Sequence, residues 1–197
     1  MKMVIPRFLL LTMLLYLTAA LFFPVKLRAE ELFFTYVGVT AGGGIQTVEY
    51  QDWWDDQRNT QTYNGNFFSG GAMMDIVVNN LVGEFTAQFM YNSLEGTPDI
   101  SVHHTLLTVT GKYRYPLLSI FNITGGLGLY MDMPPATDNY DGGGGISACI
   151  GTMIDLTLNS MLVLDVYGRY GSFGIGEEST RLTTGASLGF VYKIGRI

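Results

Sequence analysis

Both histidines of the sequence stand in the stretch DISVHHT, beside residue types that serve nucleophilic catalysis. In an extended strand Asp99, Ser101 and His103 share one face, because alternate side chains point the same way. A serine nucleophile needs a base within hydrogen-bond reach and a carboxylate that orients the base. Adjacent positions on one strand face fit that geometry poorly. A lipid-modifying enzyme is therefore the remotest hypothesis, and we expect no catalytic residue.

Other motifs that could hold a cofactor are incomplete. The stretches AGGGIQT and DGGGGIS are rich in glycine, but no helical pattern follows either one, so a phosphate cradle would lack its helix N-terminus. The single cysteine, Cys149, removes a disulfide framework and a cysteine-based zinc site. We expect no cofactor. The formal charge of −6 and the lack of a basic stripe argue against a nucleic-acid partner.

Charged residues of both signs fall on the polar side of segments in which apolar and polar residues alternate. Buried charges are tolerated only when they are paired and hydrogen-bonded. We therefore expect an ion-pair network between the polar faces, and the alternative is that some of these charges, such as Arg114 and Lys193, lie in water at a rim. The candidates for the interior are Asp75, Glu84, Lys112, Asp155, Asp165 and Arg169.

Acidic residues gather in the long connections between these segments. The set is Glu49, Asp52, Asp55, Asp56, Glu95, Asp99, Asp132, Asp138, Asp141, Glu177 and Glu178, against Arg58 and Arg181. Acidic loops can bridge divalent cations or contact cationic host or envelope molecules, or they can simply be solvated, since no spacing matches a calcium loop. Trp53 and Trp54, beside Asp55 and Asp56, are candidate contact residues, and the alternative is that their indoles cover lipid headgroups or the end of the folded domain.

The N-terminus has the layout of a secretory signal. Two basic residues precede an apolar run from Phe8 to about Val25, and the small residue Ala29 follows at a plausible cleavage point. We expect residues 1–29 to be a signal peptide and residues 30–197 to form one domain. The alternative is an uncleaved membrane anchor, because the apolar run is nearly long enough to span a bilayer.

The elements that must position these residues are strands. In FNITGGLGLYMDM, residues 121–133, large apolar side chains alternate with small or polar ones, and about eight such windows follow one another. Short connections near residues 79, 116 and 159 alternate with longer polar ones at about 44–66, 93–102, 133–143 and 172–179. This pattern predicts an all-β, eight-stranded antiparallel transmembrane β-barrel, whose interior is only wide enough for its own side chains.

Aromatic residues near the ends of these windows predict two girdles at the membrane interfaces. The residues on the loop side are Phe67, Phe68, Tyr91, Tyr170 and Phe173, and those on the turn side are Tyr113, Tyr115, Phe121, Phe190 and Tyr192.

The segments GVTAGGG, TGKYRYPL, LVLDVYGRYG and GASLGFVYKI, in this order and spacing, resemble the small eight-stranded outer-membrane barrels typified by OmpX, the OmpA transmembrane domain and OmpW. The resemblance covers about residues 31–194. It implies the outer membrane of a diderm bacterium, with outer-membrane lipids and the outer-membrane assembly machinery as partners. That machinery usually reads a terminal aromatic residue, whereas this sequence ends in YKIGRI, so either Tyr192 serves or the signal differs.

These observations favour a monomeric barrel with a largely plugged lumen, acting in envelope structure or in surface interaction with a host or envelope partner through acidic extracellular loops. The alternative is a narrow channel for small, possibly hydrophobic solutes, a passage with which OmpW-like relatives are associated. Four loop-side residues would line it: Tyr36, Met73, Leu106 and Tyr130.

Overall fold

The structure is a computed structural model that describes residues 33–54, 57–95, 100–133, 142–172 and 178–196. The expected signal peptide, Asp55 and Asp56 lie outside the described residues, as do the side chains of Trp53 and Trp54. The strands are β1 Phe33–Trp54, β2 Gln57–Val78, β3 Leu81–Glu95, β4 Ile100–Pro116, β5 Phe121–Met133, β6 Gly144–Asp155, β7 Ser160–Ser172 and β8 Glu178–Arg196. Within the described ranges, no helix is long and apolar enough to cross a membrane.

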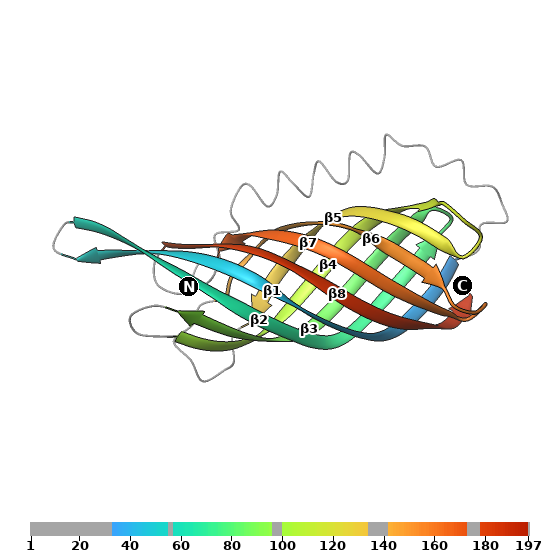
Figure 1. Ribbon diagram of the computed structural model, residues 1–197, viewed down its shortest axis with the longest axis horizontal. Coiled ribbons are helices and arrows are strands. Elements are labelled where there is room, and N and C mark those ends of the chain that lie inside the picture. Colours follow the sequence, from blue (N-terminus) through green and yellow to red (C-terminus); the bar gives the residue numbers. More distant parts are fainter. Residues whose placement is uncertain (1–32, 55–56, 96–99, 134–141, 173–177, 197) are drawn as a thin grey trace, which may run out of the picture. The chain divides into compact units, whose positions relative to one another are not determined.

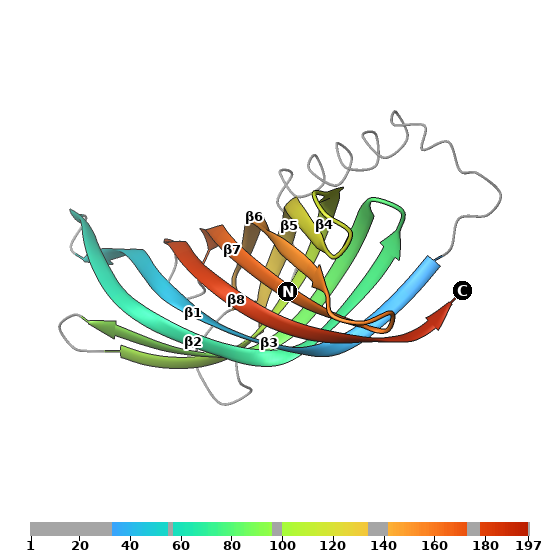
Figure 2. The same cartoon turned by 45° about the vertical axis from the view of Figure 1, so that its right-hand side comes forward.

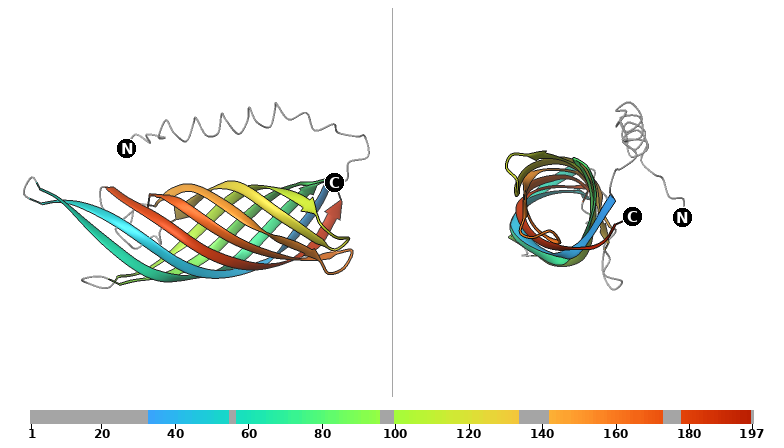
Figure 3. Two further views of the ribbon diagram at one scale, coloured as in Figure 1. Left: turned by 45° about the horizontal axis from the view of Figure 1, so that its top comes forward. Right: turned by 90° about the vertical axis from the view of Figure 1, so that its right-hand side faces the viewer.

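The eight strands form one closed antiparallel barrel. Each strand pairs with its neighbours in the chain, and β1 pairs with β8 to close the ring (Figure 1; Figure 3, right). At the β2–β3 turn Asn79 has a φ of 54°, the left-handed conformation that a tight hairpin turn requires and that asparagine tolerates. The predicted fold class is therefore confirmed.

Side chains alternate between the two faces of the barrel wall, as β5 shows. Asn122, Thr124 and Asp132 are buried on the inside, whereas Ile123 and Leu127 are exposed on the outside. The other strands repeat this arrangement, with outward residues such as Val39 and Ile150 more than half exposed. Apolar side chains outside and polar side chains inside are the reverse of a water-soluble protein, and they suit a wall that lies in hydrocarbon.

The first hairpin is much longer than the others and projects beyond the rest of the barrel (Figure 1), and Figure 2 shows that the β3–β4 hairpin extends at the same end. Strands β1 and β2 have 22 residues each, whereas β6 has 12. Pairing of β2 with β3 begins only at Asn64 and Glu95, so residues 57–63 of β2 pair with β1 alone. The prediction of a long loop at 44–66 is wrong, because polar side chains on both faces of a strand in water hide the alternation that identifies it.

Candidate functional site: the lumen and the loop end

Strand β4 passes every layer of the lumen. We call the end of the barrel where β1 and β3 end and β2 and β4 begin the loop end, and the end near residues 79–80 and 117–120 the turn end. From loop end to turn end, β4 places five buried side chains in the lumen: His104, Leu106, Thr108, Thr110 and Lys112. Arg114, next on the same side, is half-buried. Ionic, apolar, polar and again ionic layers therefore follow one another along the barrel axis.

The ionic cluster near the turn end centres on Lys112. Its Nζ lies 2.5 Å from Oε2 of Glu84 and 2.6 Å from Oδ2 of Asp165, so one ammonium group donates hydrogen bonds to carboxylates from β3 and β7. Lys112 is 2% exposed. The structure thus brings together Glu84, Lys112 and Asp165, three of the six residues that the sequence nominates for the interior. A fourth candidate, Asp75, lies opposite Glu84 in the β2–β3 register.

Asp75 differs from the other carboxylates of this cluster. Its exposure is 0%, and neither carboxylate oxygen accepts a hydrogen bond from a described residue. A buried carboxylate without a partner costs free energy, whereas an amide of the same shape does not carry the charge.

Replacing Asp75 by asparagine should therefore leave the free energy of unfolding unchanged or raise it by about 1 kcal/mol. Urea unfolding of the barrel in detergent micelles measures this change. Glu84→Gln is the matched control, and it should destabilise, because Glu84 is paired with Lys112. A loss of stability in Asp75→Asn as large as in the control would show that Asp75 has a partner.

The other two interior candidates lie elsewhere. Asp155 is the last residue of β6 and is half-buried; its Oδ2 accepts a hydrogen bond from Nδ2 of Asn122 at 3.3 Å. The Arg169 guanidinium lies over the Tyr167 ring, 4.0 Å from its centroid. Neither residue forms an ion pair with any side chain in the described ranges.

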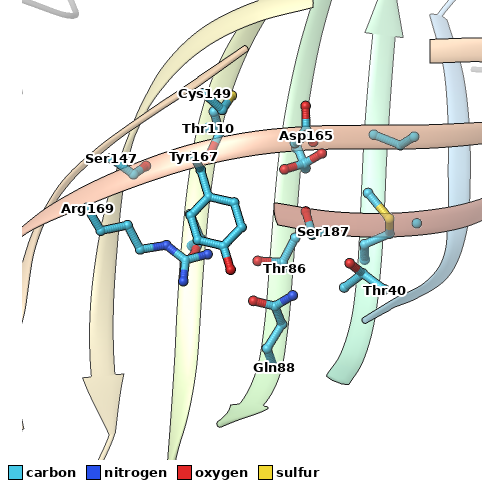
Figure 4. Close-up of a pocket in the computed structure, with 15 residues that line it drawn as sticks. Thr40, Thr86, Gln88, Thr110, Ser147, Cys149, Asp165, Tyr167, Arg169 and Ser187 are labelled. Atoms are coloured by element: carbon cyan, nitrogen blue, oxygen red, sulfur yellow. The ribbon is translucent and has the colours of Figure 1, made fainter. Parts of the chain in front are cut away.

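Between the ionic clusters lies a small polar chamber. Its volume is about 30 Å³, and Figure 4 shows the guanidinium of Arg169 beside Tyr167, with Thr86, Gln88 and Asp165 also lining the space. A single water molecule needs at least ~10–15 Å³ of such volume, so the chamber has room for about two.

A second ionic cluster lies toward the loop end. Nη2 of Arg181 is 2.6 Å from Oδ2 of Asp132, and Nε2 of His104 is 3.1 Å from the other oxygen of that carboxylate. Nδ2 of Asn92 is 3.0 Å from Nδ1 of His104. All four side chains are buried. The prediction that Asp132 and Arg181 lie in loops is wrong: Asp132 is on the inward side of β5, and β8 begins early enough, at Glu178, to turn Arg181 into the lumen.

Apolar layers separate and cap these clusters. The loop-side layer is Phe67, Met90, Leu106, Tyr130 and Tyr167. The turn-side layer is Met73, Val77, Val82, Met153, Met161, Val163 and Val191, against which Phe34 and Tyr36 pack. The four residues nominated as a channel lining face the lumen within these packed layers. Leu106 and Tyr130 belong to the loop-side layer, whereas Tyr36 and Met73 belong to the turn-side layer, so their prediction as loop-side residues is wrong. Phe67 is 0% exposed, so its prediction as an outer aromatic is wrong; Gly44 and Gly185 leave the room that its ring occupies.

The face that carries Ser101 and His103 is the outer face of the barrel. Both residues are exposed, and the His103 ring lies against Tyr91 and Phe89, with centroid distances of 4.9 Å and 5.8 Å. Asp99 lies outside the described residues. Over the described ranges, no group of three or more His, Cys, Asp or Glu side chains could hold a metal ion.

Together these features define the class of the protein. The sheet closes on itself, so the backbone groups of its wall are paired without an edge in the membrane, and the outer surface is apolar. The protein is therefore a small transmembrane β-barrel, as predicted.

Comparisons with known structures find outer-membrane proteins of low similarity. No protein-family model and no curated protein matches the sequence. The OprF N-terminal barrel of Pseudomonas aeruginosa is 12% identical with a TM-score of 0.41, covering 79% of this chain and 96% of that one. Ail of Yersinia pestis, solved with the heparin analogue sucrose octasulfate, is 14% identical with a TM-score of 0.41, covering 84% and 99%. Outer Membrane Protein W of E. coli is 14% identical with a TM-score of 0.38, covering 80% and 97%. Because these values are low, the class rests on the geometry of this chain.

Proposed function

We propose that the protein is a non-conducting outer-membrane barrel that acts in envelope structure or surface interaction through its acidic loop end. The observation that carries the proposal is the layered lumen, in which two ionic clusters alternate with apolar layers. We further propose that residues 1–29 are removed as a signal peptide, that the outer-membrane assembly machinery inserts the chain, and that the barrel is a monomer.

The lumen supports the first half of the proposal. An ion that crosses the barrel must displace Lys112 from two carboxylates and Arg181 from Asp132, and each separation leaves a buried charge without its partner. It must also pass two apolar layers that offer no ligands. The chamber between them holds about two water molecules, so it supplies no continuous path.

The loop end supports the second half. The sequence from residue 49 to residue 58 contains four acidic residues, Glu49, Asp52, Asp55 and Asp56, and one basic residue, Arg58. Glu49 and Glu95 are exposed at the base of the β1–β2 hairpin. A projecting acidic hairpin attracts cationic surfaces, and Trp53 and Trp54 are suitable anchors for a partner.

Planar-bilayer recording of the purified protein tests the plugged lumen. We expect a folded, heat-modifiable species without discrete conductance, since both ionic clusters close the lumen. Steady unitary conductance from that species would overturn the proposal and favour the alternative, a narrow channel for small solutes.

Adhesion of cells that display the protein to a cationic matrix, such as immobilised polylysine, tests the loop end. Joint replacement of Asp52, Asp55 and Asp56 by asparagine should reduce adhesion to this matrix several-fold. The double variant Trp53→Ala and Trp54→Ala should instead weaken binding to a specific partner. The matched control is Asp155→Asn, at the other end of the barrel. Equal adhesion by all variants would show that the acidic hairpin does not mediate contact with cationic surfaces.

A further inference from the structure

A polar strip continues the lipid-facing surface of β1–β4 toward the loop end. On the outer face, Phe68 of β2 pairs with Tyr91 of β3, and the next outward pairs toward the loop end are Asn66 with Ser93 and Asn64 with Glu95. All of these side chains are exposed. The outer surface thus changes from aromatic groups to amide, hydroxyl and carboxylate groups between one outward pair and the next.

Below the strip is an aromatic platform made of Phe68, Phe89, Tyr91 and His103. The rings of Phe89 and Tyr91 flank the ring of His103, with centroid distances of 5.8 Å and 4.9 Å. Aromatic ring faces carry negative charge density and accept positively polarised C–H groups, which the faces of a sugar ring present. Aromatic residues at this height also mark the level of the membrane interface.

A recess of about 260 Å³ opens within the strip. It is lined by Ile45, Thr47, Asn64, Asn66 and Glu95 and by the chain at Gln46 and Gly65. Its volume is below the ~300–1,000 Å³ of pockets that hold drug-sized ligands, which suits a ligand part of one or two rings. Oγ1 of Thr47 donates a hydrogen bond to Oδ1 of Asn64 at 2.8 Å, so the Asn64 amide nitrogen is the group that can donate to a ligand.

The chemistry of the strip selects hydroxyl groups over phosphates. Among the described outward residues that line the recess there is no lysine or arginine, and Glu95 repels anions. Phosphate groups are usually bound by guanidinium or ammonium donors. Amides and a carboxylate instead offer the mixed donors and acceptors that sugar hydroxyls, which both donate and accept, can pair with.

We propose that this surface, the saccharide strip (Thr47, Asn64, Asn66, Ser93 and Glu95), binds the saccharide headgroup of a glycolipid in the surrounding membrane. The source is a membrane lipid because the strip is continuous with the lipid-facing wall: acyl chains along Val39 and Ala72 place a headgroup at the aromatic platform and the strip. The binding is lateral, within the membrane, and is independent of any partner at the hairpin tip.

The test uses the protein purified from membranes and reconstituted in phosphatidylcholine nanodiscs. The discs contain either lipid A that carries a neutral core oligosaccharide or lipid A without that core, and native mass spectrometry measures the glycolipid retained. We expect retention of the core-bearing lipid to exceed that of the core-free lipid about tenfold. Asn64→Ala combined with Asn66→Ala should abolish the difference, and Glu95→Gln should reduce it.

The matched control is Ser172→Ala, an exposed polar residue at the loop end of β7, which should retain both lipids as the unaltered protein does. Heat-modifiable migration confirms folding of each variant. Equal retention of the two lipids, or undiminished retention by the Asn64 and Asn66 variant, would overturn the proposal. Binding of the released core oligosaccharide as tight as that of the intact glycolipid would overturn the membrane source.

Discussion

Replacing Lys112 by methionine is expected to lower the free energy of unfolding by about 3–5 kcal/mol. The reason is that this side chain is the shared cation between Glu84 and Asp165, and its removal leaves two carboxylates in the lumen without the charge that holds them. Urea titration of the barrel in micelles, followed by loss of the heat-modifiable band, measures the change.

Two further variants separate the charge from the packing. Lys193→Met removes a half-buried lysine that lies over the Phe34 ring, 3.6 Å from its centroid, and should cost little. Glu84→Gln and Asp165→Asn, added to Lys112→Met, should restore much of the lost stability, because no buried charge then lacks a partner. If the triple variant were no more stable than the single one, the loss would be due to the lysine stem and not to its charge.

Replacing Gly44 by alanine is expected to cost about 1–3 kcal/mol and to reduce the yield of folded barrel. A methyl group at Gly44 would meet the backbone oxygen of Thr184, the Cα of Gly185 at 2.6 Å and Cε1 of Phe67 at 2.9 Å. The first two atoms belong to the backbone of β8, so the β1–β8 pairing must shift to admit the methyl group.

Gly125→Ala is the matched control for this prediction. Gly125 faces outward on β5, and a methyl group there has no atom within 4 Å. The fraction of heat-modifiable species after refolding compares the two variants, and only Gly44→Ala should lower it. Equal yields would mean that the β1–β8 pairing has more room than its backbone contacts indicate.

The fold could be predicted from the sequence because a strand that separates lipid from a packed lumen alternates strictly. The same alternation, in which every second side chain faces the lumen, assigns Glu84, Lys112 and Asp165 to the inside. Parity does not give the height of a residue or the direction of its side chain across the barrel, since both depend on strand tilt and register. For that reason the sequence could not show that Lys112 holds two carboxylates while Asp155 contacts Asn122.

The loop-side cluster was missed although one signal pointed to it. Asp132 continues the parity of Thr124, Gly128 and Tyr130, and that parity faces the lumen. The expected strand window, 121–133, already contains Asp132, but a charged residue next to a connection resembles a loop residue, and Asp132 is therefore predicted to lie in a loop. Similarly, Phe67 and Phe68 are adjacent aromatic residues, so only one of them could face lipid, and the glycines opposite Phe67 decide which.

The order of the strands also bears on how the barrel forms. Every pairing except one joins strands that follow each other in the sequence, and the exception is β1 with β8. Neighbouring strands meet across short connections at a low entropic cost, whereas the two ends of the sheet must meet across almost the whole chain. Until they do, the sheet keeps two unpaired edges that can join other chains. The lifetime of this open sheet, and with it the risk of aggregation, is therefore set by how quickly the first and last strands find each other.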